Sequence, residues 1–285
     1  MSEHESQFSR RHFIGAVSAA GALAVACSNA AKTKFDTPAL LPQAPDGQPL
    51  RAGVIGCGGR GTGAANDFLK AGPNLVVTAI CDTFEDRMLK CKESLAKAGQ
   101  NISADRCFVG LDAYKKVIDS GIDLIITATP PYFRPTHFSA AIEAGKHVFM
   151  EKPVCVDPVG ARVIMDYADK AAQKGLCVVT GNQRRSQYHY WQALKLVREG
   201  AIGELVGGQV YWNQSQLWFR ERDPKWSDME WMIRDWVNWQ WLSGDHIVEQ
   251  HVHNIDVMNW FFNDHPVKAV GMGGRARRVT GDQYD

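Results

Sequence analysis

A regular alternation of apolar runs and helix-like segments restricts most strongly how this 285-residue chain can fold. The apolar runs cover residues 51–55, 75–81, 107–109, 124–128, 147–150 and 177–180, and the helix-like segments cover 61–71, 86–98, 113–120, 135–144 and 158–174. Several runs are continuous in Val, Ile and Leu, which is typical of strands buried on both faces. The alternation predicts an α/β fold with a doubly wound parallel sheet.

The pattern changes after Gly181. We predict a helix over 190–199, a strand over 205–212, a tryptophan-rich segment, a helix near 247–262 and the start of a strand over 267–272. This indicates an α+β second domain over 182–285, after a first domain over 51–181. Because its two strands would need partners near the end of the chain, we expect this domain to be truncated and the chain to be a fragment.

The first thirty residues are expected to be an export signal rather than part of the fold. Residues 9–15, Ser-Arg-Arg-His-Phe-Ile-Gly, resemble a twin-arginine motif, and the apolar stretch 16–26 that follows is too short to span a membrane. Cys27 follows small residues and is a candidate for lipid attachment. The alternative to an export signal is that these first thirty residues form an ordinary amphipathic helix. Residues 31–50 contain four prolines and predict a linker.

Charge and cysteine content narrow the class of protein. The formal net charge is +1, so no global field favours nucleic acid as a partner. The six cysteines beyond Cys27 form no C-x-x-C pair, and we expect free thiols and no metal site built from them.

A glycine-rich turn lies between the first predicted strand and helix. Gly56, Gly58 and Gly61 form a G-x-G-x-x-G pattern that includes Gly59 and Arg60, and Asp82 ends the next strand. In a Rossmann unit such glycines allow a tight turn, approach of the pyrophosphate and close helix packing, and the carboxylate binds the ribose hydroxyls. This predicts a dinucleotide site with NAD favoured over NADP, although Asp82 is also suited to capping the next helix.

Glu151, Lys152 and Pro153 follow the strand that ends at Met150. Ligands of doubly wound sheets bind beyond the carboxyl ends of the strands, so Lys152 is in a position to reach a substrate. An exposed pair of charges at a strand end is the alternative. Taken with the glycine loop and with Thr129, Pro130 and His137, this triplet resembles the glucose–fructose oxidoreductase/inositol dehydrogenase (Gfo/Idh/MocA) family.

The resemblance, which runs from about Arg51 to the end of the chain, implies further site residues. It implies that Lys152 contacts both cofactor and substrate hydroxyl, and that Thr129 and Pro130 lie beside the nicotinamide. It also implies a catalytic histidine, His253, on a helix of the second domain. Glu249 stands four residues earlier, where the family usually has aspartate.

Helical spacing places Glu249, His253 and Asp256 on one stripe of a largely apolar helix. Ionisable groups on a buried helix need partners or a function, and a histidine packed in the core is the alternative. His246, His251 and His253 do not share one helix face, so we expect no metal site. Trp236, Trp239 and Trp241 just before this helix are candidates for stacking on a sugar, with core packing as the alternative.

These features predict an exported enzyme that transfers a hydride between a tightly bound NAD and a secondary alcohol of a sugar or polyol, and that forms homo-oligomers when full length. Lys152 and His253 would act on the hydroxyl, with Glu249 orienting His253. A glycosidase that oxidises its sugar transiently is the alternative. A sugar-binding protein with a vestigial cofactor fold is disfavoured because Lys152 and His253 are both present.

Overall fold

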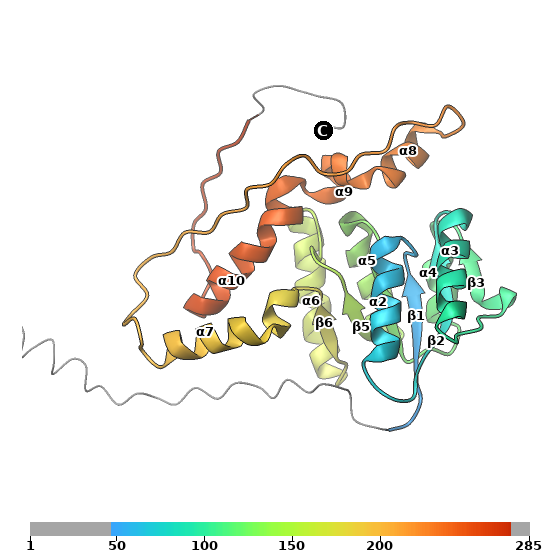
Figure 1. The fold of residues 1–285 in the computed structure, drawn as a ribbon, viewed down its shortest axis with the longest axis horizontal. Helices are drawn as coiled ribbons and strands as arrows, with labels where there is room; N and C mark the ends of the chain where they lie inside the picture. Colours follow the sequence, from blue (N-terminus) through green and yellow to red (C-terminus); the bar gives the residue numbers. More distant parts are fainter. Residues whose placement is uncertain (1–46, 275–285) are drawn as a thin grey trace, which may run out of the picture. The chain divides into compact units, whose positions relative to one another are not determined.

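The computed structural model describes residues 47–274. The predicted export signal, Cys27 and most of the predicted linker lie outside these residues. A sheet of six parallel strands forms the centre of the first domain, in the order β3-β2-β1-β4-β5-β6 (Figure 1). The strands are β1 (Leu50–Ile55), β2 (Leu75–Asp82), β3 (Cys107–Val109), β4 (Leu124–Thr127), β5 (His147–Met150) and β6 (Val178–Thr180). This is the Rossmann strand order, and it confirms the predicted doubly wound sheet.

Helices cover both faces of this sheet because the side chains of each strand alternate between two hydrophobic clusters. On β4, Leu124 and Ile126 pack in one cluster and Ile125 packs in the other. The first cluster contains residues of α2 (Gly59–Lys70) and α3 (Glu85–Lys97). The second contains residues of α4 (Ala113–Ile118), α5 (Arg134–Glu143) and α6 (Pro158–Gln173). Most predicted strand and helix ends agree with the structure within two residues.

Residues 188–207 belong to a separate compact unit that contains α7 (Tyr188–Arg198). This helix confirms the one predicted over 190–199. From Gly208 the chain belongs again to the unit that contains the sheet, and its helices are α8 (Asp228–Arg234), α9 (Gln240–Ser243) and α10 (Val252–Phe262). A π-helical turn, Ile247–His251, directly precedes α10.

The two strands predicted in the second domain are wrong. Residues 205–212 and 267–272 have no regular secondary structure, and Val206, Val267 and Met272 are almost fully exposed. A strand is stabilised by a ladder of hydrogen bonds, and within the described chain neither segment pairs with another. Both segments therefore have apolar side chains of the right type without the sheet that would bury them.

The segment with α8 and α9 packs onto loops at the carboxyl ends of the strands. Ile233 and Leu242 form a cluster with Phe84, which follows β2, and Phe133 packs against the same cluster. Arg234 adds an ion pair of 2.8 Å with Asp86 of α3. Between residues 47 and 274, no helix combines the length and apolar character needed to cross a membrane.

Candidate functional site

The glycine loop joins β1 to α2, and glycine is needed at its positions for different physical reasons. Gly56 has a φ of +93°, and a Cβ there would lie 2.9 Å from the Thr129 amide nitrogen. A Cβ on Gly61 would lie 1.8 Å from the Gly56 carbonyl oxygen. The packing of the chain itself therefore excludes a side chain at both positions.

Gly58 differs, because a Cβ there would meet no protein atom within 4 Å, and the same holds for Gly59. Gly58 is the N-cap of α2, makes no side-chain cap, and no acidic residue occupies the first turn of the helix. Free N–H groups at a helix N-terminus beside open space are suited to a phosphate. The loop therefore fits the pyrophosphate of a dinucleotide.

Asp82 is buried at the end of β2, and its carboxylate binds two backbone N–H groups. One oxygen accepts from Cys57 in the glycine loop at 2.7 Å, and the other accepts from Phe84 at 2.9 Å. Phe84, not Asp82, is the N-cap of α3. Burial raises the pKa of Asp82, and these two hydrogen bonds oppose that rise. A carboxylate has about four acceptor positions, so it can also accept from ribose hydroxyls.

Glu151 connects the glycine loop to the end of β5. Its Oε1 accepts from Arg60 Nε of α2 at 2.6 Å, and its side chain is buried. A Cβ on Gly181, after β6, would lie 2.4 Å from Glu151 Oε2, so a side chain there would require this carboxylate to move. Arg60 is thus held across the mouth of the loop by Glu151.

Arg134, which the sequence analysis did not identify, fixes the backbone around Lys152. Its buried guanidinium donates to the carbonyls of Thr129 at 2.9 Å, Glu151 at 2.9 Å and Pro153 at 2.6 Å. Burial lowers the pKa of Arg134 to about 10, so it remains charged at neutral pH. The carbonyls on both sides of Lys152 therefore have a common donor.

Lys152 and Glu249 form a buried ion pair between the loop after β5 and the π-helical turn Ile247–His251. Lys152 Nζ lies 2.9 Å from Glu249 Oε1 and also donates to the Glu249 carbonyl, and the side chains are 14% and 10% exposed. Burial raises the pKa of Glu249, while Lys152 and Arg134 act in the opposite direction. Within residues 47–274, Glu249 Oε2 has no hydrogen-bond partner.

Glu249 lies in the π-helical turn, whose wider ring of hydrogen bonds places its carbonyl and carboxylate toward Lys152. Such turns occur often at functional sites. A pocket of about 240 Å³ reaches Glu249 and is bordered by side-chain amides and a second carboxylate. These lining residues include Gln214, Asn238, Asp245 and Gln250. The pocket therefore offers several groups able to hydrogen-bond hydroxyls.

His253 is buried in the first turn of α10, and its ring stacks on Trp212 with centroids 5.2 Å apart. Burial, followed by the positive charges of Lys152 and Arg184, lowers its pKa to about 4. His253 Nδ1 has no partner among residues 47–274. The ring is therefore neutral at pH 7 and has a nitrogen not engaged by the described chain.

Other predicted site residues have structural partners of their own. Asp256 binds Arg185 through both carboxylate oxygens and is not paired with Lys152. Thr129 Oγ1 lies 3.2 Å from His137 Nδ1, and His137 is buried beside Tyr114, with its pKa lowered to about 4 chiefly by burial. A contact of Thr129, Pro130 or His137 with a cofactor stays a prediction.

Trp236, Trp239 and Trp241 pack against the cluster around Phe84. Trp241 also contacts Tyr132 edge to face, with ring centroids 5.2 Å apart. The three tryptophans thus pack in the core, which was the alternative to sugar stacking. Contact of these tryptophans with a substrate stays a prediction.

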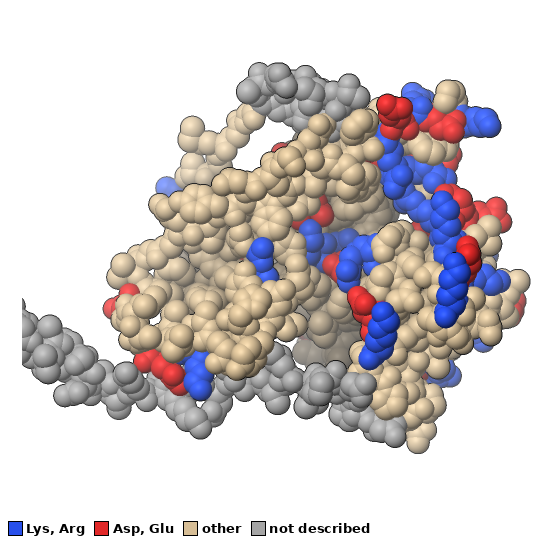
Figure 2. Space-filling view, in the orientation of Figure 1, with Lys and Arg blue, Asp and Glu red and all other residues tan. Residues whose placement is uncertain are grey.

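Charges of both signs alternate on the face that Figure 2 shows, without a large area of one sign. In the described part of the chain, no three histidine, cysteine or acidic side chains are grouped so that they could hold a metal ion. The charged groups at the carboxyl edge of the sheet are instead paired across it, as Arg60 with Glu151 and Lys152 with Glu249.

Known proteins match both the sequence and the fold. Family 109 glycosyl hydrolase proteins of Solibacter usitatus and Streptomyces coelicolor are 31% and 30% identical, over 65% and 70% of this chain. The chain spans 42% and 44% of their lengths. Myo-inositol 2-dehydrogenase of Lactobacillus plantarum has a similar fold, with a TM-score of 0.56 and 24% identity over 76% of this chain and 57% of that one.

A second solved structure, scyllo-inositol dehydrogenase of Lactobacillus casei with bound NAD(H) and scyllo-inositol, has a TM-score of 0.55 and 21% identity over 76% of this chain and 57% of that one. Residues 50–180 match the Gfo/Idh/MocA oxidoreductase family, described by its NAD-binding Rossmann fold. The glycine loop, Asp82 and the segment from Thr129 to Lys152 all lie within this match. Over residues 50–180, the chain is therefore similar to the Gfo/Idh/MocA oxidoreductase family.

Proposed function

We propose that this chain carries the cofactor site and the proton-transfer residues of an enzyme that oxidises or reduces a secondary alcohol of a sugar or polyol. The observation that carries the proposal is the buried Lys152–Glu249 pair beside the neutral His253 ring, at the edge of the sheet that bears the glycine loop. When bound there, NAD supplies the acceptor or donor of the hydride. The solved dehydrogenase with NAD(H) and an inositol supports this choice of cofactor and substrate class.

The roles of the residues follow from their charge states. Neutral His253 accepts the proton of the substrate hydroxyl through its unengaged Nδ1. The Lys152 ammonium donates to the hydroxyl oxygen and stabilises the negative charge that develops on it. Glu249 orients the ammonium, and Arg134 fixes the backbone that carries it. Polar groups of the pocket beside Glu249 bind the remaining hydroxyls.

A second candidate is a glycosidase, favoured by curated relatives that are named family 109 glycosyl hydrolases. Here the same residues would assist oxidation of a sugar hydroxyl by bound NAD, which acidifies the neighbouring carbon and allows elimination of the aglycone. Water would then add to the unsaturated ketone and the hydride would return to the sugar, so that the net reaction is hydrolysis without net oxidation. A twin-arginine signal suits this cycle, because a protein exported in its folded state can carry a cofactor acquired in the cytoplasm.

Product analysis on the full-length protein separates the two candidates. We expect NAD in the supernatant after denaturation of dialysed protein, because both candidates keep the cofactor bound. The glycosidase returns the hydride to its own sugar, and the oxidoreductase passes it to a second substrate that has a carbonyl group. With aryl glycosides and free polyols as substrates, a glycosidase releases the aglycone without net NADH absorbance, and an oxidoreductase converts the alcohol without releasing an aglycone. Absence of nucleotide together with activity that needs added NAD would contradict the retained cofactor.

Replacing Asp82 by Ser is expected to weaken NAD binding and to reduce discrimination against NADP. Loss of hydrogen bonds to this carboxylate costs about 1.5–3 kcal/mol, and removal of its charge relieves repulsion of a 2′-phosphate. Titration of both nucleotides against wild type and variant measures the effect, with thermal unfolding as a control because Asp82 also binds Cys57 and Phe84. An unchanged ratio of affinities with lowered stability would make Asp82 a loop support only.

A further inference from the structure

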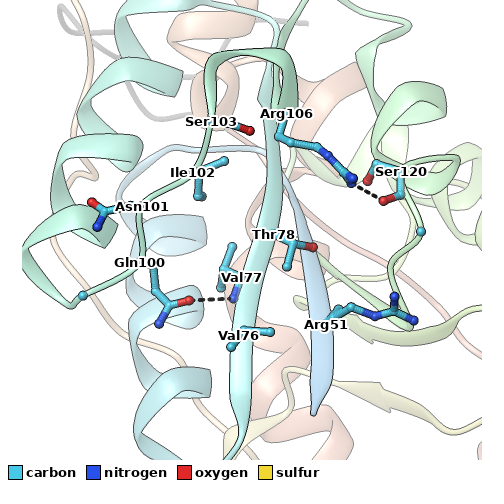
Figure 3. Close-up of a pocket in the computed structure, with 12 residues that line it drawn as sticks. Arg51, Val76, Val77, Thr78, Gln100, Asn101, Ile102, Ser103, Arg106 and Ser120 are labelled. Atoms are coloured by element: carbon cyan, nitrogen blue, oxygen red, sulfur yellow. Dashed lines mark hydrogen bonds between the residues drawn. The ribbon is translucent and has the colours of Figure 1, made fainter.

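A second pocket lies at the opposite edge of the sheet from the glycine loop, at the amino ends of β1 and β2 (Figure 3). Its volume is about 480 Å³, within the range of small-molecule sites. It exists because β3 has only three residues and pairs with β2 only from Ile80 onward. The loop of residues 99–103 and Arg106, rather than a strand, border the first half of β2.

The pocket is lined by cationic and neutral polar groups. Its twelve lining residues include two arginines, three hydroxyls and two amides, and no carboxylate. Asp123 neutralises the Arg51 guanidinium through two hydrogen bonds of 2.8 and 2.9 Å. Arg106 instead donates to the Ser120 carbonyl, which is neutral, and no carboxylate of the described chain forms an ion pair with it. Its guanidinium has further N–H donors that can bind a ligand, and the carboxylate of the neighbouring Asp105 is not among the lining residues of the pocket.

Thr78 supplies a second, independent observation. Its hydroxyl oxygen is buried and has no hydrogen-bond partner among residues 47–274. An unsatisfied buried hydroxyl destabilises a fold unless something else hydrogen-bonds to it. Figure 3 shows this hydroxyl on the same side of β2 as the side chains of Arg106 and Ser120. Thr78 and Arg106 both line this pocket.

The strand itself is irregular at this position. The register between β1 and β2 passes from Ala52 opposite Val77 to Gly53 opposite Ala79, which leaves Thr78 without an opposite residue. The neighbouring Val77 N–H donates to the Gln100 side chain at 3.2 Å instead of to a strand. Bulges of this kind redirect a side chain and are frequent beside binding sites.

We propose that this pocket binds a small oxyanion, either inorganic phosphate or the phosphate group of an ester. The Arg106 guanidinium neutralises the charge, and the Thr78 hydroxyl donates to one of the oxygens. Arginine is suited to this role because its planar donors match a tetrahedral oxyanion with two hydrogen bonds. The site is separate from the dinucleotide site and does not depend on the proposed enzymatic function.

The test measures binding of inorganic phosphate to NAD-saturated full-length protein, so that the glycine loop is already occupied. Calorimetry and thermal unfolding are run at constant ionic strength, with chloride as the reference anion. We expect saturable binding and an increase in Tm with phosphate for wild type. Thr78→Val should reduce the affinity several-fold, and Arg106→Gln should abolish saturable binding.

Arg162→Gln on exposed α6 removes the same charge outside the pocket and is the matched control; it should leave phosphate binding unchanged. In chloride, Thr78→Val should be as stable as wild type or more stable, because it removes an unsatisfied hydroxyl. This shows that a loss of phosphate binding is not a loss of folding. The proposal is overturned if phosphate does not bind saturably, or if wild type, Thr78→Val and Arg106→Gln bind it equally.

A phosphate ester is distinguished from the free anion by a second titration. Glycerol phosphate and inorganic phosphate are compared against the same variants. Tighter binding of the ester, lost in Arg106→Gln, would identify the ester as the natural class of ligand. Equal binding of both would identify the free anion.

Discussion

Turnover by the full-length protein is expected to fall about 10²–10⁴-fold when His253 is replaced by Ala or Lys152 by Met, the range for a positioned acid or base. His253 is the neutral group with an unengaged nitrogen, and Lys152 is the cation beside it. Single-turnover reduction of the nicotinamide measures the chemical step directly. NAD content should be nearly unchanged in His253→Ala, because the residue lies outside residues 50–180, which match the NAD-binding family model.

Two controls separate a chemical role from a structural one. Rates are expressed per folded molecule, with the folded fraction taken from thermal unfolding. Asn254→Ala changes a neighbouring residue that binds Arg184 and should lower stability without a comparable loss of rate. A normal reduction rate in His253→Ala would exclude His253 as the base and make Glu249 the next candidate.

The dependence on pH gives a further signature of His253. Because its pKa in the folded protein is about 4, kcat/KM of wild type should fall as pH drops through about 4. The folded pKa lies below the ordinary value of 6.5, so the folded state binds fewer protons. Titration of His253 therefore lowers the free energy of unfolding as pH falls from about 6.5 toward 4. His253→Ala should remove both effects.

The first domain could be predicted closely because its signals are local. Continuous runs such as 124–128 show burial on both faces. The positive φ of Gly56 and the contact of Gly61 with the Gly56 carbonyl are set within the glycine loop. The strands predicted at 205–212 and 267–272 failed because a strand also needs a partner, which no local pattern shows. The turn at Ile247–His251 was predicted as ordinary helix, since a π turn differs by one residue in its hydrogen bonding.

The site could be predicted only as far as its motifs reach. Lys152, Glu249 and His253 were named as site residues, and their catalytic roles stay predictions. The resemblance did not indicate that Glu249 pairs with Lys152. Arg134 was missed because an arginine at a helix start usually faces solvent. Its position between Phe133 and Pro135, in an apolar turn, is the signal that it is buried. Asp256 has a suitable spacing, yet its partner is Arg185, which is distant in sequence.

Breaking the Lys152–Glu249 pair is expected to lower the free energy of unfolding more than removing both charges. Lys152→Met leaves the Glu249 carboxylate buried without its cation, which costs about 3–5 kcal/mol. The double variant Lys152→Met/Glu249→Gln leaves no buried charge at this position, so it should recover much of that loss. Denaturant unfolding of wild type, both single variants and the double variant forms a thermodynamic cycle.

The pH dependence of Lys152→Met decides whether the unpaired Glu249 carboxylate causes the loss of stability. Burial already raises the Glu249 pKa above 4.5, and loss of the Lys152 charge raises it further. Because the folded state then binds more protons than the unfolded state, Lys152→Met should be destabilised as pH rises from about 4.5 through the raised pKa. The double variant has no carboxylate here and should lack this decline. If the single losses simply add and Lys152→Met shows no extra pH dependence, the pair contributes nothing to holding the π-helical turn against the loop after β5, and Lys152 is free to serve the substrate alone.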